Sequence, residues 1–116
     1  MKPTILIVED VVLVRMATAD MIGQLGYPVA EAGDGPRALS ALRNDPAIGI
    51  MLADLGLPGM PGRELIEKAR TMRPSLLVVV ASGYPRDENG DDPAFRGVRY
   101  LPKPFDVAEL RRALEG

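Results

Sequence analysis

Short apolar runs recur along the chain and are separated by stretches in which apolar residues have helical spacing. Three runs, at residues 5–8, 48–53 and 76–81, are nearly continuous and rich in β-branched side chains. Such runs are typical of strands that are buried on both faces of a parallel sheet. Weaker strand candidates lie at residues 28–32 and 98–101. The pattern therefore predicts five strands.

The stretches between these runs predict helices. Pro36 suits the first turn of one helix, because its fixed φ angle and missing N–H are tolerated there. Asp106, with Glu109 three residues later, predicts the N-cap of the last helix. The first helix should end at Gly26 and turn one face inward. That face consists of Val14, Ala17, Met21, Ile22 and Leu25.

The alternation of strands and helices predicts an α/β fold in a single domain of residues 1–116. The sheet should be parallel, with right-handed crossovers and helices on both faces. Residues 84–97 should hold the fourth helix, but their two prolines and two glycines predict a short or irregular one. In such folds the functional site lies at the carboxyl ends of the strands.

Composition limits the chemistry that this edge can support. The chain has no cysteine and no histidine, which excludes disulfides, thiolate or imidazole metal ligands, and Ser–His or Cys–His catalysis. No apolar run approaches the ~20 residues of a membrane helix, and no secretory cleavage site follows the amino terminus. A net charge of −2 predicts no binding to nucleic acid or to anionic membranes.

Polar residues follow four of the predicted strands. Glu9 and Asp10 come after the first, Asp54 after the third, Ser82 ends the fourth, and Lys103 follows the fifth. Three carboxylates that converge repel one another unless a divalent cation joins them, and oxygen ligands favour Mg²⁺, with Mn²⁺ or Ca²⁺ as alternatives. An ammonium group and a hydroxyl group suit a phosphoryl group. Taken singly, an aspartate after a strand is most often a turn former or a helix cap.

Four segments together resemble the receiver domains of bacterial two-component response regulators. They are residues 5–10 (Ile-Leu-Ile-Val-Glu-Asp), 52–62 (Leu-Ala-Asp-Leu-Gly-Leu-Pro-Gly-Met-Pro-Gly), 80–84 (Val-Ala-Ser-Gly-Tyr) and 100–105 (Tyr-Leu-Pro-Lys-Pro-Phe). The resemblance covers essentially the whole chain, and the last two segments look most like receivers attached to hybrid histidine kinases. It implies a flavodoxin-like, doubly wound (βα)5 fold with strand order 2-1-3-4-5.

The resemblance also implies a role for each of the acidic residues. Asp54 would be the phosphoacceptor, and Glu9 and Asp10 would be the acidic pair that holds Mg²⁺. Gly56 would present its backbone carbonyl to the metal, and Lys103 would pair with the phosphoryl group. The domain would then catalyse its own phosphorylation and dephosphorylation as a signalling module, and would not be an enzyme for a separate substrate.

The remaining matched positions concern the switch between states. Ser82 resembles the hydroxyl that hydrogen-bonds the phosphoryl group, and Tyr100 the aromatic residue that responds to it; Tyr100 could instead be an ordinary half-buried strand residue. Pro104 matches the proline that commonly forms a cis peptide bond with the lysine. The chain departs from the family at residues 11–13 (Val-Val-Leu), where most receivers are polar, so we expect an unusually apolar rim.

The expected partners are a histidine kinase or histidine phosphotransfer protein as donor, and a downstream effector protein. We expect a cytoplasmic monomer or weak dimer, because the irregular stretch at residues 84–97 weakens a surface that many receivers use to dimerise. Residues 1–116 contain no output domain, which suits a stand-alone relay component or a part of a larger kinase. Three alternatives stay open: an aspartyl phosphohydrolase, a flavodoxin-like cofactor binder, and a pseudo-receiver that is never phosphorylated.

Overall fold

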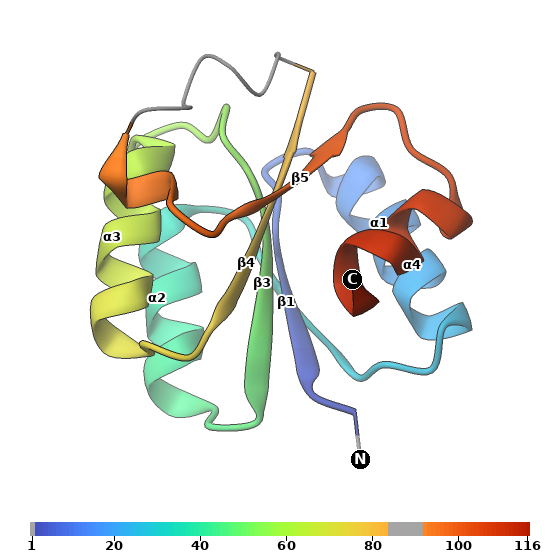
Figure 1. The fold of residues 1–116 in the computed structure, drawn as a ribbon, viewed down its shortest axis with the longest axis horizontal. Coiled ribbons are helices and arrows are strands. Elements are labelled where there is room, and N and C mark those ends of the chain that lie inside the picture. The colour runs from blue at the N-terminus through green and yellow to red at the C-terminus, as the bar shows by residue number, and fades with distance from the viewer. Residues whose placement is uncertain (1, 84–91) are drawn as a thin grey trace.

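The computed structural model describes residues 2–83 and 92–116 and contains one sheet of five parallel strands (Figure 1). The strands are ordered β2-β1-β3-β4-β5, as predicted. Adjacent strands in this order pair in parallel throughout. Their bounds are β1 Thr4–Val8, β2 Val29–Ala32, β3 Ile48–Asp54, β4 Leu77–Ser82 and β5 Arg99–Pro102.

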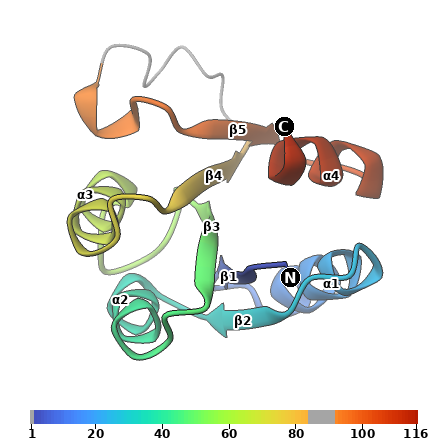
Figure 2. The same cartoon turned by 60° about the horizontal axis from the view of Figure 1, so that its bottom comes forward.

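Helices cover both faces of the sheet (Figure 2). Helices α2 (Gly35–Asn44) and α3 (Gly62–Met72) pack on one face, and α1 (Val12–Gln24) and α4 (Val107–Glu115) pack on the other. None of the helices in the described part of the chain is long and apolar enough to cross a membrane. The α/β architecture is therefore the one predicted from the alternation of strands and helices.

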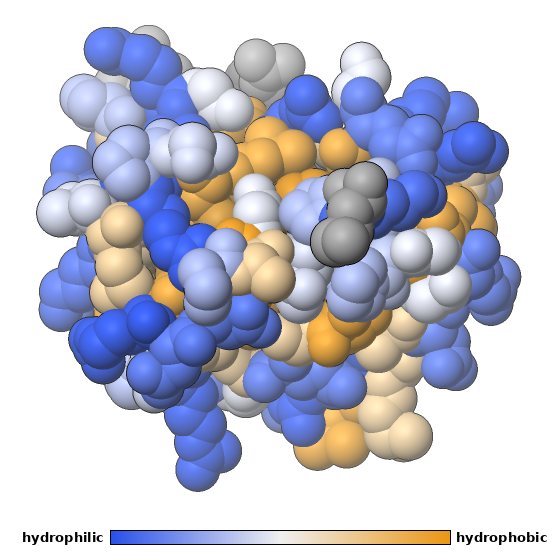
Figure 3. Space-filling model, turned by 90° about the horizontal axis from the view of Figure 1, so that it is seen from below, coloured by the Kyte–Doolittle hydropathy of each residue, from blue (hydrophilic) through white to orange (hydrophobic). Residues whose placement is uncertain are grey.

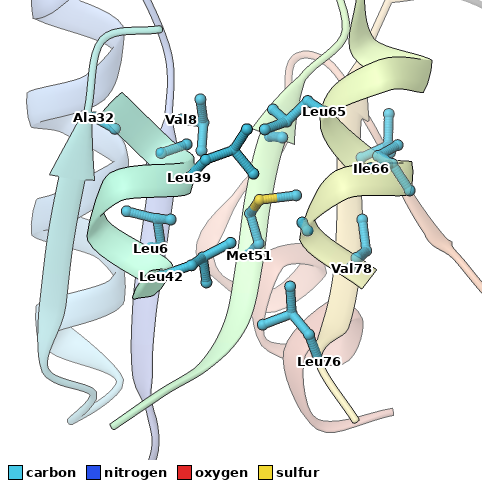
Figure 4. Close-up of a cluster of buried hydrophobic side chains, with 14 of the residues drawn as sticks. Leu6, Val8, Ala32, Leu39, Leu42, Met51, Leu65, Ile66, Leu76 and Val78 are labelled. Carbon is cyan, nitrogen blue, oxygen red and sulfur yellow. The ribbon is translucent and has the colours of Figure 1, made fainter. Parts of the chain in front are cut away.

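The sheet supplies side chains to two separate apolar clusters, one on each face. In β1, Leu6 and Val8 contribute to the cluster under α2 and α3 (Figure 4), whereas Ile5 and Ile7 contribute to the cluster under α1 and α4. Consecutive strand residues point to opposite faces, so a strand covered on both faces must be apolar at every position. This explains why the sequence shows continuous apolar runs.

Three helix ends, the starts of α2 and α4 and the end of α1, follow local capping rules. The Asp34 side chain caps α2 by accepting a hydrogen bond from the Arg37 N–H at 2.8 Å, with proline in the first turn. At α4, Asp106 and Glu109 form the predicted capping box, with reciprocal bonds of 2.8 and 3.0 Å. Gly26, just beyond α1, has a φ of 90°, a left-handed conformation that glycine adopts without strain.

The predicted inner face of α1 was partly wrong. Val14 is 39% exposed and Ala17 is exposed, whereas α1 buries Thr18 and Ile22. Thr18 was missed because threonine counts as polar in a hydrophobic pattern. Its hydroxyl donates to the Val14 carbonyl at 2.9 Å, so the polar atom is satisfied within the helix and the methyl group can face the sheet.

The connection between β4 and β5 contains a single short element among its described residues. The fourth helix was expected within residues 84–97, of which 84–91 lie outside the described residues. In the described part, η2 is a 3-10 turn at Pro93–Phe95. The Asp92 side chain caps this turn by accepting from the Ala94 N–H at 3.0 Å. Within residues 92–97, the described part of this stretch, the element is short, as predicted.

Two arginines of α3 hold this connection. Arg63 forms an ion pair with Asp92, with 2.7 Å between Nε and Oδ2, and this pairing raises the pKa of Arg63 and lowers the pKa of Asp92. Arg70 donates to the backbone carbonyls of Ala94 at 3.2 Å and Arg96 at 2.6 Å. The described part of the β4–β5 connection, from residue 92 onward, is thus bound to α3 by charged side chains.

The amino and carboxyl ends of the strands lie at opposite ends of the sheet (Figure 1). Hydrophilic side chains cover much of the end at which the amino terminus lies (Figure 3). The other end, where the strands have their carboxyl termini, carries the β1–α1 and β3–α3 connections (Figure 1). All of the residues predicted to form the functional site, except Tyr100, lie at or just beyond these carboxyl termini.

Candidate functional site

Three carboxylates meet at the carboxyl ends of the two central strands. Glu9 and Asp10 follow β1, and Asp54 is the last residue of β3. Because β1 pairs with β3 and Val8 lies opposite Ala53, the residues that follow are brought side by side. Carboxylate oxygens of the three residues lie within 4.8 Å of one another. The structure therefore brings together the acidic residues that the sequence analysis singled out.

Lys103 joins two of these carboxylates. Its Nζ lies 3.0 Å from Glu9 Oε1 and 3.2 Å from Asp54 Oδ2. Burial lowers the pKa of Lys103, but the hydrogen bond that Lys103 donates to Glu9 and the charges of Asp54 and Glu9 outweigh this effect, so the net pKa is raised. The ammonium group is therefore fully charged at neutral pH and offsets part of the acidic charge.

The backbone around Lys103 fixes where its side chain starts. The Lys103 N–H donates to the Ser82 carbonyl at 3.0 Å, which extends the β4–β5 pairing by one residue. The Lys103–Pro104 peptide bond is cis, as the resemblance implied. The Lys103 backbone is thus bound to β4, the strand next to β3, and its side chain extends from there to the carboxylates.

The three carboxylates have different surroundings. Glu9 is 4% exposed, and its second oxygen accepts from the Val11 N–H at 3.1 Å. Asp54 is half-buried, and its Oδ1 accepts from the Gly56 N–H at 2.9 Å. The Asp10 side chain is exposed and makes no hydrogen bond or ion pair with the rest of the described chain.

The donor set fits a hard divalent cation. Three carboxylates and one ammonium group leave net negative charge in a space less than 5 Å across, and a divalent cation would remove the repulsion. All available side-chain ligands are oxygen atoms, because the chain has no histidine or cysteine. Such a set suits Mg²⁺, which binds through one or two carboxylates, waters and phosphate oxygens.

Ser82 and Tyr100 lie on the neighbouring strands. Ser82 is the last residue of β4 and is 7% exposed; β4 pairs with β3, and Asp54 lies opposite Ala81. Tyr100 lies on β5 opposite Val80, is half-buried, and packs against the cluster under α2 and α3. Ser82 is therefore at the edge of the site, whereas Tyr100 is set back from it.

An apolar rim adjoins the acidic residues. The described chain has five exposed large hydrophobic residues, and all of them lie between residues 11 and 16. The rim consists of Val11, Val12, Leu13, Val14 and Met16, which are 49%, 53%, 77%, 39% and 55% exposed. The unusual apolar rim predicted from residues 11–13 is thus present at the surface. Exposed apolar residues that gather at one place commonly mark an interaction surface.

Sequence reasoning missed Arg15. Its Nη1 donates to the Glu9 carbonyl at 2.8 Å, and its Nε donates to Glu31 Oε1 at 3.1 Å. The one available signal was a single arginine among the apolar residues at the start of the first helix. That signal does not identify the partners, because Glu31 lies on another strand.

Comparison with known proteins gives consistent matches. The family model of the response regulator receiver domain matches residues 5–115. Sensor kinase CckA of Brucella abortus is 33% identical over 109 residues, which cover 92% of this chain and 12% of that protein. Sporulation initiation phosphotransferase F of Bacillus subtilis is 26% identical over 116 residues, which cover 99% of this chain and 93% of that protein.

A solved structure gives the same fold. The response regulator TrrA of Thermotoga maritima, in complex with Mg²⁺–BeF, has a TM-score of 0.86 at 22% identity. The alignment covers 99% of this chain and 97% of that one.

The family match covers every element that contributes to the acidic site. It decides against the aspartyl phosphohydrolase and the flavodoxin-like cofactor binder. The chain belongs to the response regulator receiver domain family, whose members are phosphoacceptor signalling modules of two-component systems rather than enzymes for a separate substrate.

Proposed function

We propose that Asp54 is the residue of this receiver that accepts the phosphoryl group. The observation that carries the proposal is the position of its carboxylate at the end of β3, between Lys103 and the two other acidic residues. In the transfer, a carboxylate oxygen of Asp54 forms a bond to phosphorus while the bond from phosphorus to the donor nitrogen or oxygen breaks. The product is an aspartyl phosphate.

The charges around Asp54 support this assignment. A carboxylate and a phosphorylated donor are both anionic, so their approach is unfavourable unless positive charge lies between them. Lys103 is held 3.2 Å from Asp54 and can pair with a phosphoryl oxygen instead. Ser82, at the end of the adjacent strand, would donate a hydrogen bond to another phosphoryl oxygen.

We propose Mg²⁺ as the metal of this site. Glu9, Asp10, Asp54 and the backbone carbonyl of Gly56 would hold it, Glu9 through a water molecule. When bound, the metal would neutralise charge on the phosphoryl oxygens. The similar fold of TrrA, which was crystallised with Mg²⁺–BeF, supports this choice, as does the all-oxygen donor set.

The donor is proposed to be a histidine kinase or a histidine phosphotransfer protein. Similarity to part of a sensor kinase and to most of a sporulation phosphotransferase supports this partner class. A donor protein must cover the rim of the site, because phosphorus has to come within bonding distance of Asp54. We therefore propose that the apolar rim contacts the donor. Kinases form phosphohistidine from ATP, so we expect the protein in the cytoplasm.

Residues 1–116 are proposed to act as one receiver domain that changes conformation on phosphorylation. Elements from β1 to α4 share the two apolar clusters of one sheet, which supports a single unit. Ser82 and Tyr100 are proposed as the switch: Ser82 would move toward the phosphoryl group, and the Tyr100 ring would turn into the space that it leaves.

Incubation with acetyl phosphate and Mg²⁺ tests the proposed function. Intact-mass spectrometry should find one added phosphate on the wild-type protein and none on Asp54→Asn. Asp20→Asn, which changes an exposed carboxylate of α1, is the matched control and should be labelled like the wild type. An unlabelled wild-type protein would instead support the pseudo-receiver.

A further inference from the structure

We propose that Arg15 is a positioning residue that holds the turn carrying Glu9 and Asp10 in the geometry needed for metal binding. The proposal deepens the function proposed above and rests on the acidic pair being the metal site. Arg15 lies in the first turn of α1, and its side chain is 20% exposed. Its guanidinium group forms no hydrogen bond or ion pair with Asp10 or Asp54 in the described structure and instead bonds to the backbone of Glu9.

The side chain of Arg15 forms a hydrogen bond to the turn at Glu9. Nη1 donates to the Glu9 carbonyl at 2.8 Å, while the backbone N–H of Arg15 donates to the Val11 carbonyl at 2.9 Å. The second bond is the ordinary backbone bond that opens α1, so what the Arg15 side chain adds is the bond at the Glu9 end of the short turn between β1 and α1. Asp10 lies between the two bound residues.

The turn needs this support because α1 lacks a side-chain cap. The N-cap residue is Val11, whose side chain offers no hydrogen-bonding group, whereas serine, threonine, aspartate or asparagine is usual at this position. The Val11 N–H is satisfied by the Glu9 side chain at 3.1 Å. That carboxylate is one of the proposed metal residues, so a loose turn would disturb the site directly.

The other end of Arg15 is anchored on β2. Its Nε pairs with Glu31 at 3.1 Å, and the Glu9 N–H donates to the Ala32 carbonyl at 3.0 Å. The guanidinium group also lies close to the backbone after β2, where a Cβ added at Gly33 would come within 3.3 Å of Nη1. The planar, forked guanidinium thus ties the acidic turn to the neighbouring strand.

A simple charge effect predicts a different outcome from positioning. As a nearby cation, Arg15 would weaken binding of Mg²⁺, so its removal would strengthen binding. As a positioning residue it lowers the cost of ordering the carboxylates, so its removal would weaken binding. Arg15→Lys separates the two effects, because lysine keeps the charge but cannot bridge the Glu9 carbonyl and Glu31 with a rigid fork.

The experiment uses Arg15→Lys, Arg15→Met and the wild-type protein, with Arg37→Met as the matched control. Arg37 is a largely exposed arginine whose ion pair with Asp34 lies on α2. Mg²⁺ affinity is measured by NMR titration. Both Arg15 variants should bind Mg²⁺ about 10-fold more weakly, the usual scale for loss of a residue that orients a ligand, and Arg37→Met should bind like the wild type. Unchanged or tighter binding in Arg15→Lys would overturn the proposal.

A second readout uses the metal-free protein. Hydrogen exchange and ¹⁵N relaxation of the Asp10 and Val11 amides should show faster opening in both Arg15 variants, with the amides of β3 unchanged. If the turn amides behave as in the wild type, Arg15 does not hold the turn. This result stands even if Asp54 is never phosphorylated, so the two proposals can fail separately.

If the Arg15 variants do not fold, Glu31→Gln can replace them in the Mg²⁺ titration. Glu31 is 43% exposed in its side chain, so the substitution should be tolerated. Glu31→Gln should also weaken Mg²⁺ binding, but by less than the Arg15 variants do, because the Arg15 bond to the Glu9 carbonyl remains. Equal affinities of Glu31→Gln and the wild type would argue against the anchor on β2 and overturn the proposed geometry.

Discussion

Glu9 and Asp10 are adjacent in the sequence, yet their carboxylates have different surroundings. Glu9 is buried, with one oxygen bonded to Lys103 and the other to the Val11 N–H. Asp10 is exposed and keeps its oxygens available. A metal can bind Asp10 without breaking a bond, whereas direct binding to Glu9 would displace one.

We therefore expect Mg²⁺ binding to depend more on Asp10 than on Glu9. In NMR titrations, Asp10→Asn should weaken Mg²⁺ binding by at least about 10-fold more than Glu9→Gln does, since a direct ligand loses more than one that acts through water. Equal losses, or a greater loss for Glu9→Gln, would reverse the two roles.

Lys103 has opposite effects on metal binding and on phosphoryl transfer. Lys103→Met removes the cation between Glu9 and Asp54, so Mg²⁺ should bind more tightly while phosphorylation by acetyl phosphate becomes slower. Without Mg²⁺ the variant should lose about 1–3 kcal/mol of unfolding free energy, because the buried Glu9 carboxylate loses its charged partner. Urea unfolding with and without Mg²⁺ measures this, with Lys68→Met on the exposed face of α3 as the control.

The contribution of the Lys103 ion pairs to the free energy of unfolding should fall as pH rises. The pKa of Lys103 is raised in the folded protein. Its stabilising contribution is therefore fully present below the unfolded pKa of about 10.4 and is lost as pH rises through the folded value. The stability difference between wild type and Lys103→Met should shrink above about pH 10.5; a constant difference would contradict the ion pair.

At the scale of the elements, the start of α1 serves two purposes. Its first turn shapes the acidic site, and its exposed side chains form the apolar rim. The pattern of the sequence predicted the helix but misjudged which side faces inward. Thr18 could be placed only once its hydroxyl was known to bond within the helix.

The apolar rim should matter for protein donors and not for small ones. Leu13→Asp should leave labelling by acetyl phosphate unchanged. Transfer from a phosphorylated histidine phosphotransfer protein should slow by about 10-fold or more, since burial of one leucine contributes about 1.5–3 kcal/mol. Leu13→Met keeps the apolar surface and should retain transfer. Equal transfer rates for Leu13→Asp and wild type would place the donor elsewhere.

The β4–β5 region should respond to the state of Asp54. Addition of beryllofluoride, a phosphoryl mimic, should shift NMR signals of Tyr100 and of residues 92–99 in the wild type, because Ser82 moves toward the mimic. In Ser82→Ala these distant shifts should disappear while those near Asp54 remain. Distant shifts that persist in Ser82→Ala would mean that another residue carries the signal, and their absence in the wild type would make Tyr100 an ordinary strand residue.

At the scale of the whole molecule, the fold was predictable because its sheet is covered on both faces. Continuous apolar runs marked β1, β3 and β4, and the polar residues after them located the site. Arg15 was not predictable, since its role depends on a contact with Glu31, 16 residues away on a different strand. The same holds for Arg63, whose ion pair with Asp92 joins two elements that only the fold brings together.

The identity of the phosphorylated residue can be read directly. The protein is labelled with acetyl phosphate and Mg²⁺ and then reduced with borohydride, which converts an aspartyl phosphate into homoserine. Tandem mass spectrometry of the digested protein then locates the homoserine. We expect homoserine at position 54 and nowhere else. Homoserine at position 10, or at any aspartate outside the acidic site, would contradict it.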